Sequence, residues 1–154
     1  MRWDKGRDKI ERMLSDGYVQ RVPASREHAD RLLAEAERHL ASAGSLAADD
    51  PQGAFALMYD ASRKALTAIL ANQGLRPTTA GGHRAVYDAV CAQFVPPMSA
   101  TLRPFDRMRR RRAEIEYPDV GTPAVTEPDV NEDVPKARAI LDFAADVLDQ
   151  MSPF

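Results

Sequence analysis

The sequence predicts an all-α domain: an up-and-down bundle of four long helices with a shorter N-terminal helix added. Apolar residues recur with helical spacing along most of the chain, whereas convincing alternation of period two is absent and β-branched residues are sparse. The length of 154 residues is that of one domain with a single core. We therefore expect residues 1–154 to form one unit, with residues 1–23 as a helical extension.

Two helices are expected before residue 45. Residues 4–14 form an amphipathic segment that stops at Asp16-Gly17. After a break at Val22-Pro23, Ser25 is the expected N-cap of a helix that runs to about residue 43. One face of this helix is apolar, because the i, i+3, i+4, i+7 rule is followed by Ala29, Leu32, Leu33, Ala36 and Leu40.

The next helix is expected to be the central one. Asp50 caps it, Pro51 occupies its first position, and it ends at Gly74. It is apolar almost all round, which is typical of a helix buried on every side. Asp60 and Lys64 are exceptions that lie four residues apart, so we expect them to pair.

Three more helices are expected after a loop at residues 75–82. They cover residues 83–94, residues from between 99 and 102 up to Pro118, and residues 132–151. Pro104 and Pro135 are each expected in a first helical turn, since a proline further along removes a hydrogen bond. The acidic, proline-rich segment 118–131 is expected to be a loop.

Composition excludes several classes of protein. Hydrophobic residues make up 44% and charged residues 29%, as in ordinary globular domains, and no apolar run could span a bilayer. The charged N-terminus is not a secretory signal, and the single Cys91 forms no internal disulfide, so a cytoplasmic location is expected. Walker, dinucleotide-binding and HExxH motifs are absent, so neither a cofactor nor a metal is expected.

The charges are unevenly distributed although the net charge is only -2. Residues 103–112 hold six arginines and one acid, Asp106, and the following residues 114–133 are acidic. On a helical projection Leu102, Phe105, Met108 and Ile115 share an arc of roughly 140°. Arg112 lies in the middle of this arc, with Arg109 and Glu116 inside it, whereas the side chains pointing away are those of Arg103, Arg107, Arg110, Arg111 and Glu114.

The inward arginines need partners, because a desolvated charge is costly unless it is paired. Glu116, one turn after Arg112, and Asp60 on the central helix are the candidates. Three roles are open for Arg112 and Arg109. They form structural ion pairs with such acids or cover the core with their stems, they bind phosphate or RNA in a cleft, or they line a dimer interface. The outward arginines form a solvated face or attract nucleic acid.

The aromatic and histidine side chains near this helix each have two interpretations. Tyr117 packs on the end of the bundle or presents its hydroxyl at the mouth of the arginine cleft. His83 follows Gly81-Gly82 and is either a local hydrogen-bonding group or a catalyst. His28 and His39 lie on a charged helix face and are expected at the surface.

Four segments together resemble the HEPN superfamily of small helical domains from prokaryotic toxin–antitoxin, defence and RNA-processing systems. They are residues 36–41 (AERHLA), 59–66 (YDASRKAL), 81–86 (GGHRAV) and 109–118 (RRRRAEIEYP), and the resemblance covers about residues 24–151. It implies a homodimer with a cleft between protomers. In active members this cleft carries a motif of an arginine, four to six residues and then a histidine. These members cleave RNA without a metal.

This chain departs from that motif. Ile115 stands at the histidine position counted from Arg110, and residues 113–118 contain no histidine. The resemblance therefore implies a dimeric module that binds RNA or nucleotide phosphate through Arg109, Arg110, Arg112 and Tyr117, with nuclease activity weakened or absent. The alternatives are an active metal-independent endoribonuclease with catalytic candidates Arg112, Arg109, Glu116 and His83, or a non-catalytic adaptor for a protein partner. In some members a partner nucleotidyltransferase attaches AMP to the motif tyrosine, a position that Tyr117 matches.

Overall fold

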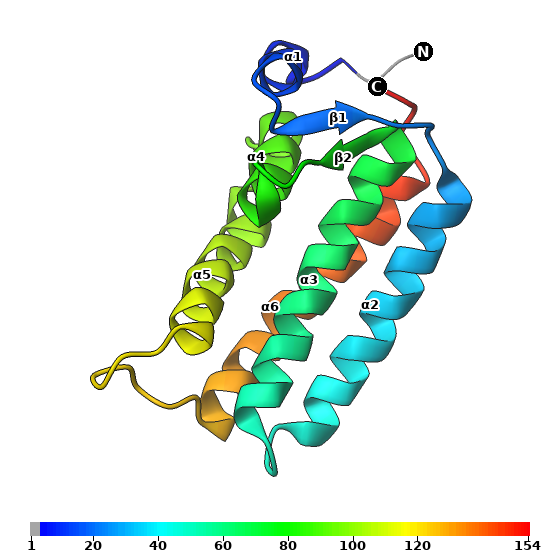
Figure 1. Ribbon diagram of the computed structural model, residues 1–154. Helices are drawn as coiled ribbons and strands as arrows, with labels where there is room; N and C mark the ends of the chain where they lie inside the picture. The colour runs from blue at the N-terminus through cyan, green and yellow to red at the C-terminus, as the bar shows by residue number, and fades with distance from the viewer. Residues whose placement is uncertain (1–3) are drawn as a thin grey trace.

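The computed structural model describes residues 4–154, which form six helices and two short strands (Figure 1). The all-α prediction is confirmed. In chain order the elements are α1 (Arg7–Ser15), β1 (Val19–Arg21), α2 (Arg26–Leu46), α3 (Pro51–Gln73), β2 (Leu75–Pro77), α4 (Gly82–Phe94), α5 (Ser99–Glu116) and α6 (Glu127–Leu148).

Helix α3 is central, as its apolar sequence predicts. It packs against α2 and α6 on one side and against α4 and α5 on the other (Figure 1). Its side chains are buried along its whole length, from Phe55 and Met58 to Leu66 and Leu70. The position of α3 therefore brings residues of α4 and α5 against one of its faces, which is where the candidate site lies.

The predicted helix caps are present. Ser25 Oγ accepts a hydrogen bond from the backbone N–H of His28 at the start of α2. Asp50 Oδ1 accepts one from Gly53 at the start of α3, and α3 ends at Gly74, whose positive φ of 82° suits a residue without a Cβ. These boundaries depend on contacts within one helical turn, so the local sequence is sufficient to predict them.

Both proline predictions are wrong. Pro104 and Pro135 lie inside α5 and α6, because α5 begins at Ser99 and α6 begins at Glu127. Each proline leaves one helical carbonyl without a donor, four residues earlier, at Ala100 and Asn131. Both of these residues are exposed, so water can hydrogen-bond to those carbonyls in place of the missing N–H groups.

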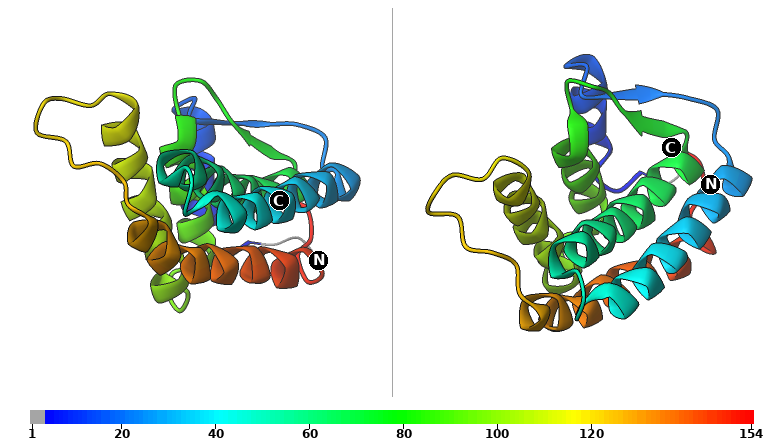
Figure 2. Two further views of the ribbon diagram at one scale, coloured as in Figure 1. Left: turned by 90° about the horizontal axis from the view of Figure 1, so that it is seen from below. Right: turned by 60° about the horizontal axis from the view of Figure 1, so that its bottom comes forward.

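The acidic loop is shorter than expected. A capping box, in which Thr126 and Asp129 exchange side-chain and backbone hydrogen bonds, begins α6. Residues 127–131 are therefore helical, and the loop comprises residues 117–126. Figure 2 shows this loop projecting away from the helices between α5 and α6.

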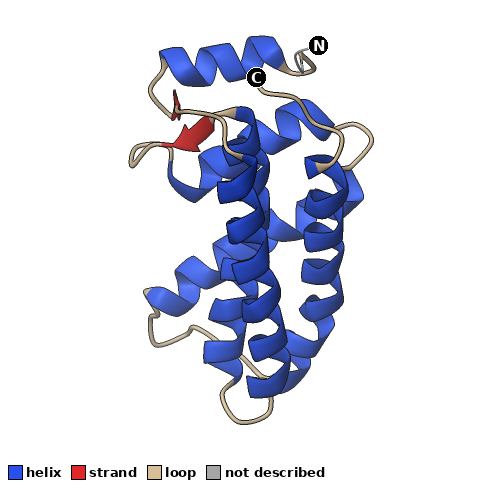
Figure 3. Cartoon of the chain, turned by 90° about the vertical axis from the view of Figure 1, so that its right-hand side faces the viewer, coloured by secondary structure: helices blue, strands red, loops and turns tan. Residues whose placement is uncertain are grey.

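The segment expected as a loop at residues 75–82 contains strand β2, which pairs with β1 in an antiparallel sheet. The register places Val19 opposite Pro77 and Arg21 opposite Leu75. Strands of three residues are too short to show a period-two pattern, which explains why the sequence did not reveal them. The sheet lies beside α1 at the end of the bundle that carries the C-terminus (Figure 3).

None of the helices in residues 4–154 combines the length and the apolar character needed to cross a bilayer.

Candidate functional site

The apolar face of α5 is directed as the helical projection predicts. Leu102, Phe105 and Met108 are fully buried, and Ile115 is half-buried. Arg112 lies over α3, with its guanidinium carbon 5.3 Å from the ring centroid of Tyr59, and its side chain is 37% exposed. Arg112 therefore points inward, and its stem contributes to the cover of the core.

The expected partner of Arg112 is confirmed. Arg112 Nη1 donates to Glu116 Oε2 at 2.8 Å, one turn along the same helix. Arg109 donates through Nε and Nη2 to Asp106 Oδ1 at 3.0 and 2.8 Å. The other candidate, Asp60, forms ion pairs with Arg63 and Lys64 of its own helix instead.

The outward arginines are less uniform than predicted. The side chain of Arg111 is only 21% exposed, close to the 23% of Arg109, because its Nη2 donates to the Pro123 carbonyl of the loop at 2.8 Å. Arg107 forms a two-pronged ion pair with Asp133 of α6, a residue only 4% exposed. Two of the four arginines assigned to a solvated face therefore hold parts of the fold together.

Five of the six arginines line two different cavities. A cavity of about 930 Å³ between α5 and α6 is lined by the outward set, namely Arg103, Arg107, Arg110 and Arg111. Arg112 instead lines a separate cavity of about 560 Å³ where α3 begins and α5 ends. The six arginines of residues 103–112 thus do not share a single cleft.

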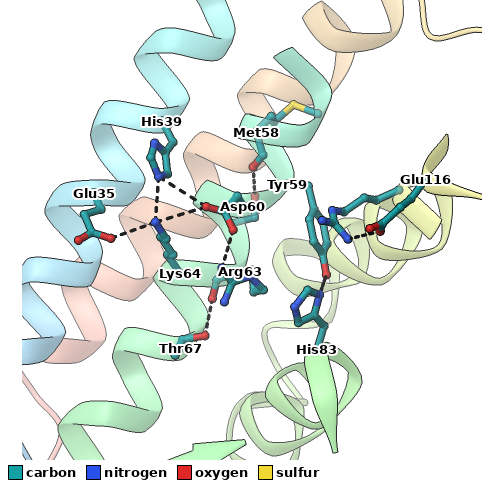
Figure 4. Close-up of polar contacts among 12 residues, drawn as sticks. Glu35, His39, Met58, Tyr59, Asp60, Arg63, Lys64, Thr67, His83 and Glu116 are labelled. Carbon is teal, nitrogen blue, oxygen red and sulfur yellow. Dashed lines mark hydrogen bonds and ion pairs between the residues drawn. The ribbon is translucent and has the colours of Figure 1, made fainter. Parts of the chain in front are cut away.

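Tyr59, whose ring lies beneath Arg112, forms a pair with His83 (Figure 4). Tyr59 Oη of α3 is 2.7 Å from Nδ1 of His83, which occupies the first turn of α4. The Tyr59 ring is 1% exposed and stacks on Phe105 with ring centroids 5.5 Å apart, whereas His83 is exposed. His83 is a candidate that the sequence predicts, whereas nothing in the sequence singles out Tyr59.

The surroundings keep both members of this pair neutral at neutral pH. Burial raises the pKa of Tyr59 to about 12, although the positive charges of Arg112, Arg63 and Arg109 oppose the shift. Burial also lowers the pKa of His83, and the positive charges of Arg63 and Arg112 lower it further. The neutral imidazole therefore has one nitrogen that donates a hydrogen bond and one that accepts. Nδ1 faces the tyrosine, which leaves Nε2 for a ligand.

A third arginine, Arg63, joins the group from α3. Its Nη2 donates to Asp60, and Asp60 also pairs with Lys64 at 3.4 Å, as the sequence predicts. His39 is half-buried beside them, with Nε2 2.9 Å from Lys64 Nζ and 3.5 Å from Asp60 Oδ2, so the prediction of a surface histidine is wrong there (Figure 4). His28 is exposed as expected.

Helical spacing could have found part of this network. Asp60, Arg63 and Lys64 interrupt an otherwise apolar helix one turn apart, and this spacing is a recognisable signal for an ion-paired cluster. The proximity of Arg63 to Arg109 and Arg112 depends on how α3 packs against α5, which local spacing does not specify.

The exposure of Tyr117 at the end of α5 excludes one of its two interpretations from the sequence. Tyr117 is 80% exposed, so it does not pack on the end of the bundle. Ile115 lines the smaller cavity with Arg112 and Glu116. Residues 4–154 contain no group of three or more histidine, cysteine or acidic side chains placed to hold a metal ion.

The sequence match and the helical architecture together define the class of this protein. Residues 28–148 match the family model of the HEPN domain, which covers most of the chain. The chain belongs to the HEPN domain family. No curated protein and no solved structure matches it.

Proposed function

We propose that this HEPN domain binds RNA or nucleotide phosphate through Arg63, Arg109 and Arg112. The observation that supports the proposal is their convergence on the Tyr59–His83 pair: the Arg112 guanidinium carbon lies 5.3 Å from the Tyr59 ring centroid, and the charges of all three arginines act to lower the pKa of both members of the pair. Arginine suits this role because its planar fork matches the oxygens of a phosphate. Arg110 and Tyr117, which are both strongly exposed, are peripheral contacts in this proposal.

The existing ion pairs leave room for an anion. Arg63, Arg109 and Arg112 are each paired with a carboxylate on their own helix, within one turn. Such partly exposed pairs contribute little free energy, so a phosphate can compete for the guanidinium groups. The same carboxylates hold the arginines in place before a ligand arrives.

We propose that the domain acts as a homodimer in the cytoplasm of a prokaryote, as part of a toxin–antitoxin or defence system. Exposure of Tyr117 leaves its hydroxyl accessible to a nucleotidyltransferase that would attach AMP. An adaptor role for a protein partner would need no arginine site, so phosphate binding separates it from this proposal.

A second candidate function is metal-independent cleavage of RNA, and the exposed His83 beside the arginines favours it. In that reaction the neutral imidazole would take the proton of a 2′-hydroxyl, whose oxygen attacks the adjacent phosphorus. The 5′-oxygen would leave and take a proton from water, giving a 2′,3′-cyclic phosphate, with Arg112 stabilising the added negative charge. Because the motif histidine is absent, we expect this activity to be weak or missing.

Fluorescence anisotropy with a labelled single-stranded RNA tests the binding proposal. We expect binding that weakens steeply with salt, and about tenfold weaker binding by Arg112→Ala and Arg63→Ala at low salt. Arg138→Ala is the matched control, since Arg138 is an ion-paired arginine of similar exposure that pairs with Glu37 of α2. Equal affinities for all four proteins, or binding insensitive to salt, would contradict the proposal.

Incubation of cellular RNA with the protein in EDTA tests the second candidate. Cleavage by the wild type that is lost in both Arg112→Ala and His83→Gln would establish the ribonuclease. Binding without cleavage would leave a phosphate-binding module.

A further inference from the structure

The cavity of about 560 Å³ beside Arg112 adjoins the proposed phosphate site. It lies where α3 begins and α5 ends, and Arg112 belongs to both places: its side chain lines the cavity, and its guanidinium lies over Tyr59. The cavity therefore lies next to a phosphate bound at Arg112.

The lining combines apolar side chains with polar ones. Phe55, Ala56 and Ile115 contribute the apolar surface, of which Ala56 is exposed. The polar side chains of the lining, called its rim below, are those of Asp50, Gln52 and Glu116. This combination suits a flat ring with polar edges, because the faces of the ring need apolar contact and its edges need hydrogen-bonding partners.

The carboxylates of the rim retain acceptor capacity. Asp50 Oδ1 accepts the capping hydrogen bond from Gly53, and Glu116 Oε2 accepts from Arg112. Their second oxygens, Asp50 Oδ2 and Glu116 Oε1, accept no further hydrogen bond from residues 4–154. Two negative charges repel a phosphate and attract N–H donors, so the phosphate belongs at Arg112 and the donors belong in the cavity.

We propose that this cavity receives the base of the nucleotide whose phosphate Arg112 binds, and that it favours guanine; this inference rests on the proposed function. Guanine presents two adjacent donors, N1–H and the N2 amino group, which the free carboxylate oxygens of the rim can accept. Adenine and cytosine each present a single amino group, and the N3–H of uracil is flanked by two carbonyls that a carboxylate repels. Bases of single-stranded RNA are commonly read at these edges.

Four labelled octamers test this inference: oligouridine in which the fourth residue is guanosine, inosine, adenosine or uridine. Inosine differs from guanosine only in lacking the 2-amino group, so it isolates that contact. We expect the guanosine octamer to bind about tenfold more tightly than the uridine octamer, with inosine in between.

Two variants of the cavity make the test specific. Ala56→Phe fills the cavity from an exposed position, and Asp50→Asn removes one rim charge while keeping an efficient helix cap. Ala56→Phe should equalise the guanosine and uridine affinities, and Asp50→Asn should reduce the difference. Ala34→Phe, at an exposed alanine of α2, is the control and should change neither affinity.

The outcomes separate this inference from the proposed function. Salt-sensitive binding with equal affinity for all four octamers would overturn base recognition and leave phosphate binding standing. A guanosine preference that survives Ala56→Phe would place base recognition elsewhere and also overturn the inference. Absence of salt-sensitive binding to every octamer would overturn the proposed function itself.

Discussion

Arg107 and Arg112 are chemically identical and lie five residues apart on α5, yet they face different environments. Arg107 reaches α6 and pairs with Asp133, which is almost fully buried. Arg112 lies over α3 and pairs with Glu116 of its own helix, a side chain that is 47% exposed. The comparison teaches that the burial of the partner, more than the arginine itself, decides whether such a residue is structural or available to a ligand.

The physical reason is the cost of a buried charge. A buried carboxylate that loses its partner is left with an unpaired charge in a poorly solvated place, whereas an exposed carboxylate is rehydrated. Lys136, 3.5 Å from Asp133, supplies only part of the compensation. Arg107 is therefore expected to be needed for the fold, and Arg112 for binding.

The largest expected effect is that of Arg107→Ala on stability. We expect a loss of about 2–3 kcal/mol in the free energy of unfolding, because Asp133 keeps only the longer contact with Lys136. Urea denaturation followed by circular dichroism measures it. Arg103→Ala, at an exposed arginine bonded to Ser99, is the control and should change stability by less than about 0.5 kcal/mol. Equal losses in the two variants would remove the distinction made for Arg107.

Arg112→Ala should weaken RNA binding more than it lowers stability. We expect a stability loss of less than about 1 kcal/mol, since its ion pair is partly exposed, together with the tenfold loss of RNA affinity described above. Arg110→Ala removes a strongly exposed arginine from the same helix and should weaken RNA binding less than twofold. A large stability loss on Arg112→Ala with unchanged RNA affinity would reverse the comparison and make Arg112 structural.

The smallest expected effect concerns His83 and pH. Because its pKa is lower in the folded protein than the ordinary 6.5, the unfolded chain binds more protons in the range below 6.5. Folding stability should therefore fall as pH decreases from 6.5 through the lowered pKa of His83. Above pH 6.5 His83 should contribute no pH dependence to stability. Thermal unfolding of wild type and His83→Gln between pH 4.5 and 8 measures the difference. A steeper pH dependence in His83→Gln than in wild type would show that the sign is wrong.

Most of the helices could be predicted because their signals are local. Ser25 and Asp50 cap helices through bonds to residues three positions later, and Gly74 ends α3 through its own backbone conformation. The prolines misled the prediction because a helix tolerates Pro104 and Pro135 where the released carbonyl faces water. That exposure is a property of the packed domain.

The site was predicted in part. The helical projection placed Arg112 toward the core and named Glu116 as its partner, since both follow from spacing along one helix. It failed for Arg107, whose partner Asp133 lies 26 residues away, and it did not include Arg63. Contacts between helices depend on crossing geometry and loop length, which residue spacing does not describe.

The sequence by itself determined the helical class, the central place of α3, the caps at Ser25 and Asp50, and the direction of Arg112. All of these follow from residues within one or two turns of each other, where helical geometry is known in advance. Only the tertiary structure decided that Tyr59 meets His83, that Arg63 joins the arginines of α5, and that Arg107 pairs with Asp133. These contacts bring together residues on different helices, and only the packing of the core determines which faces meet.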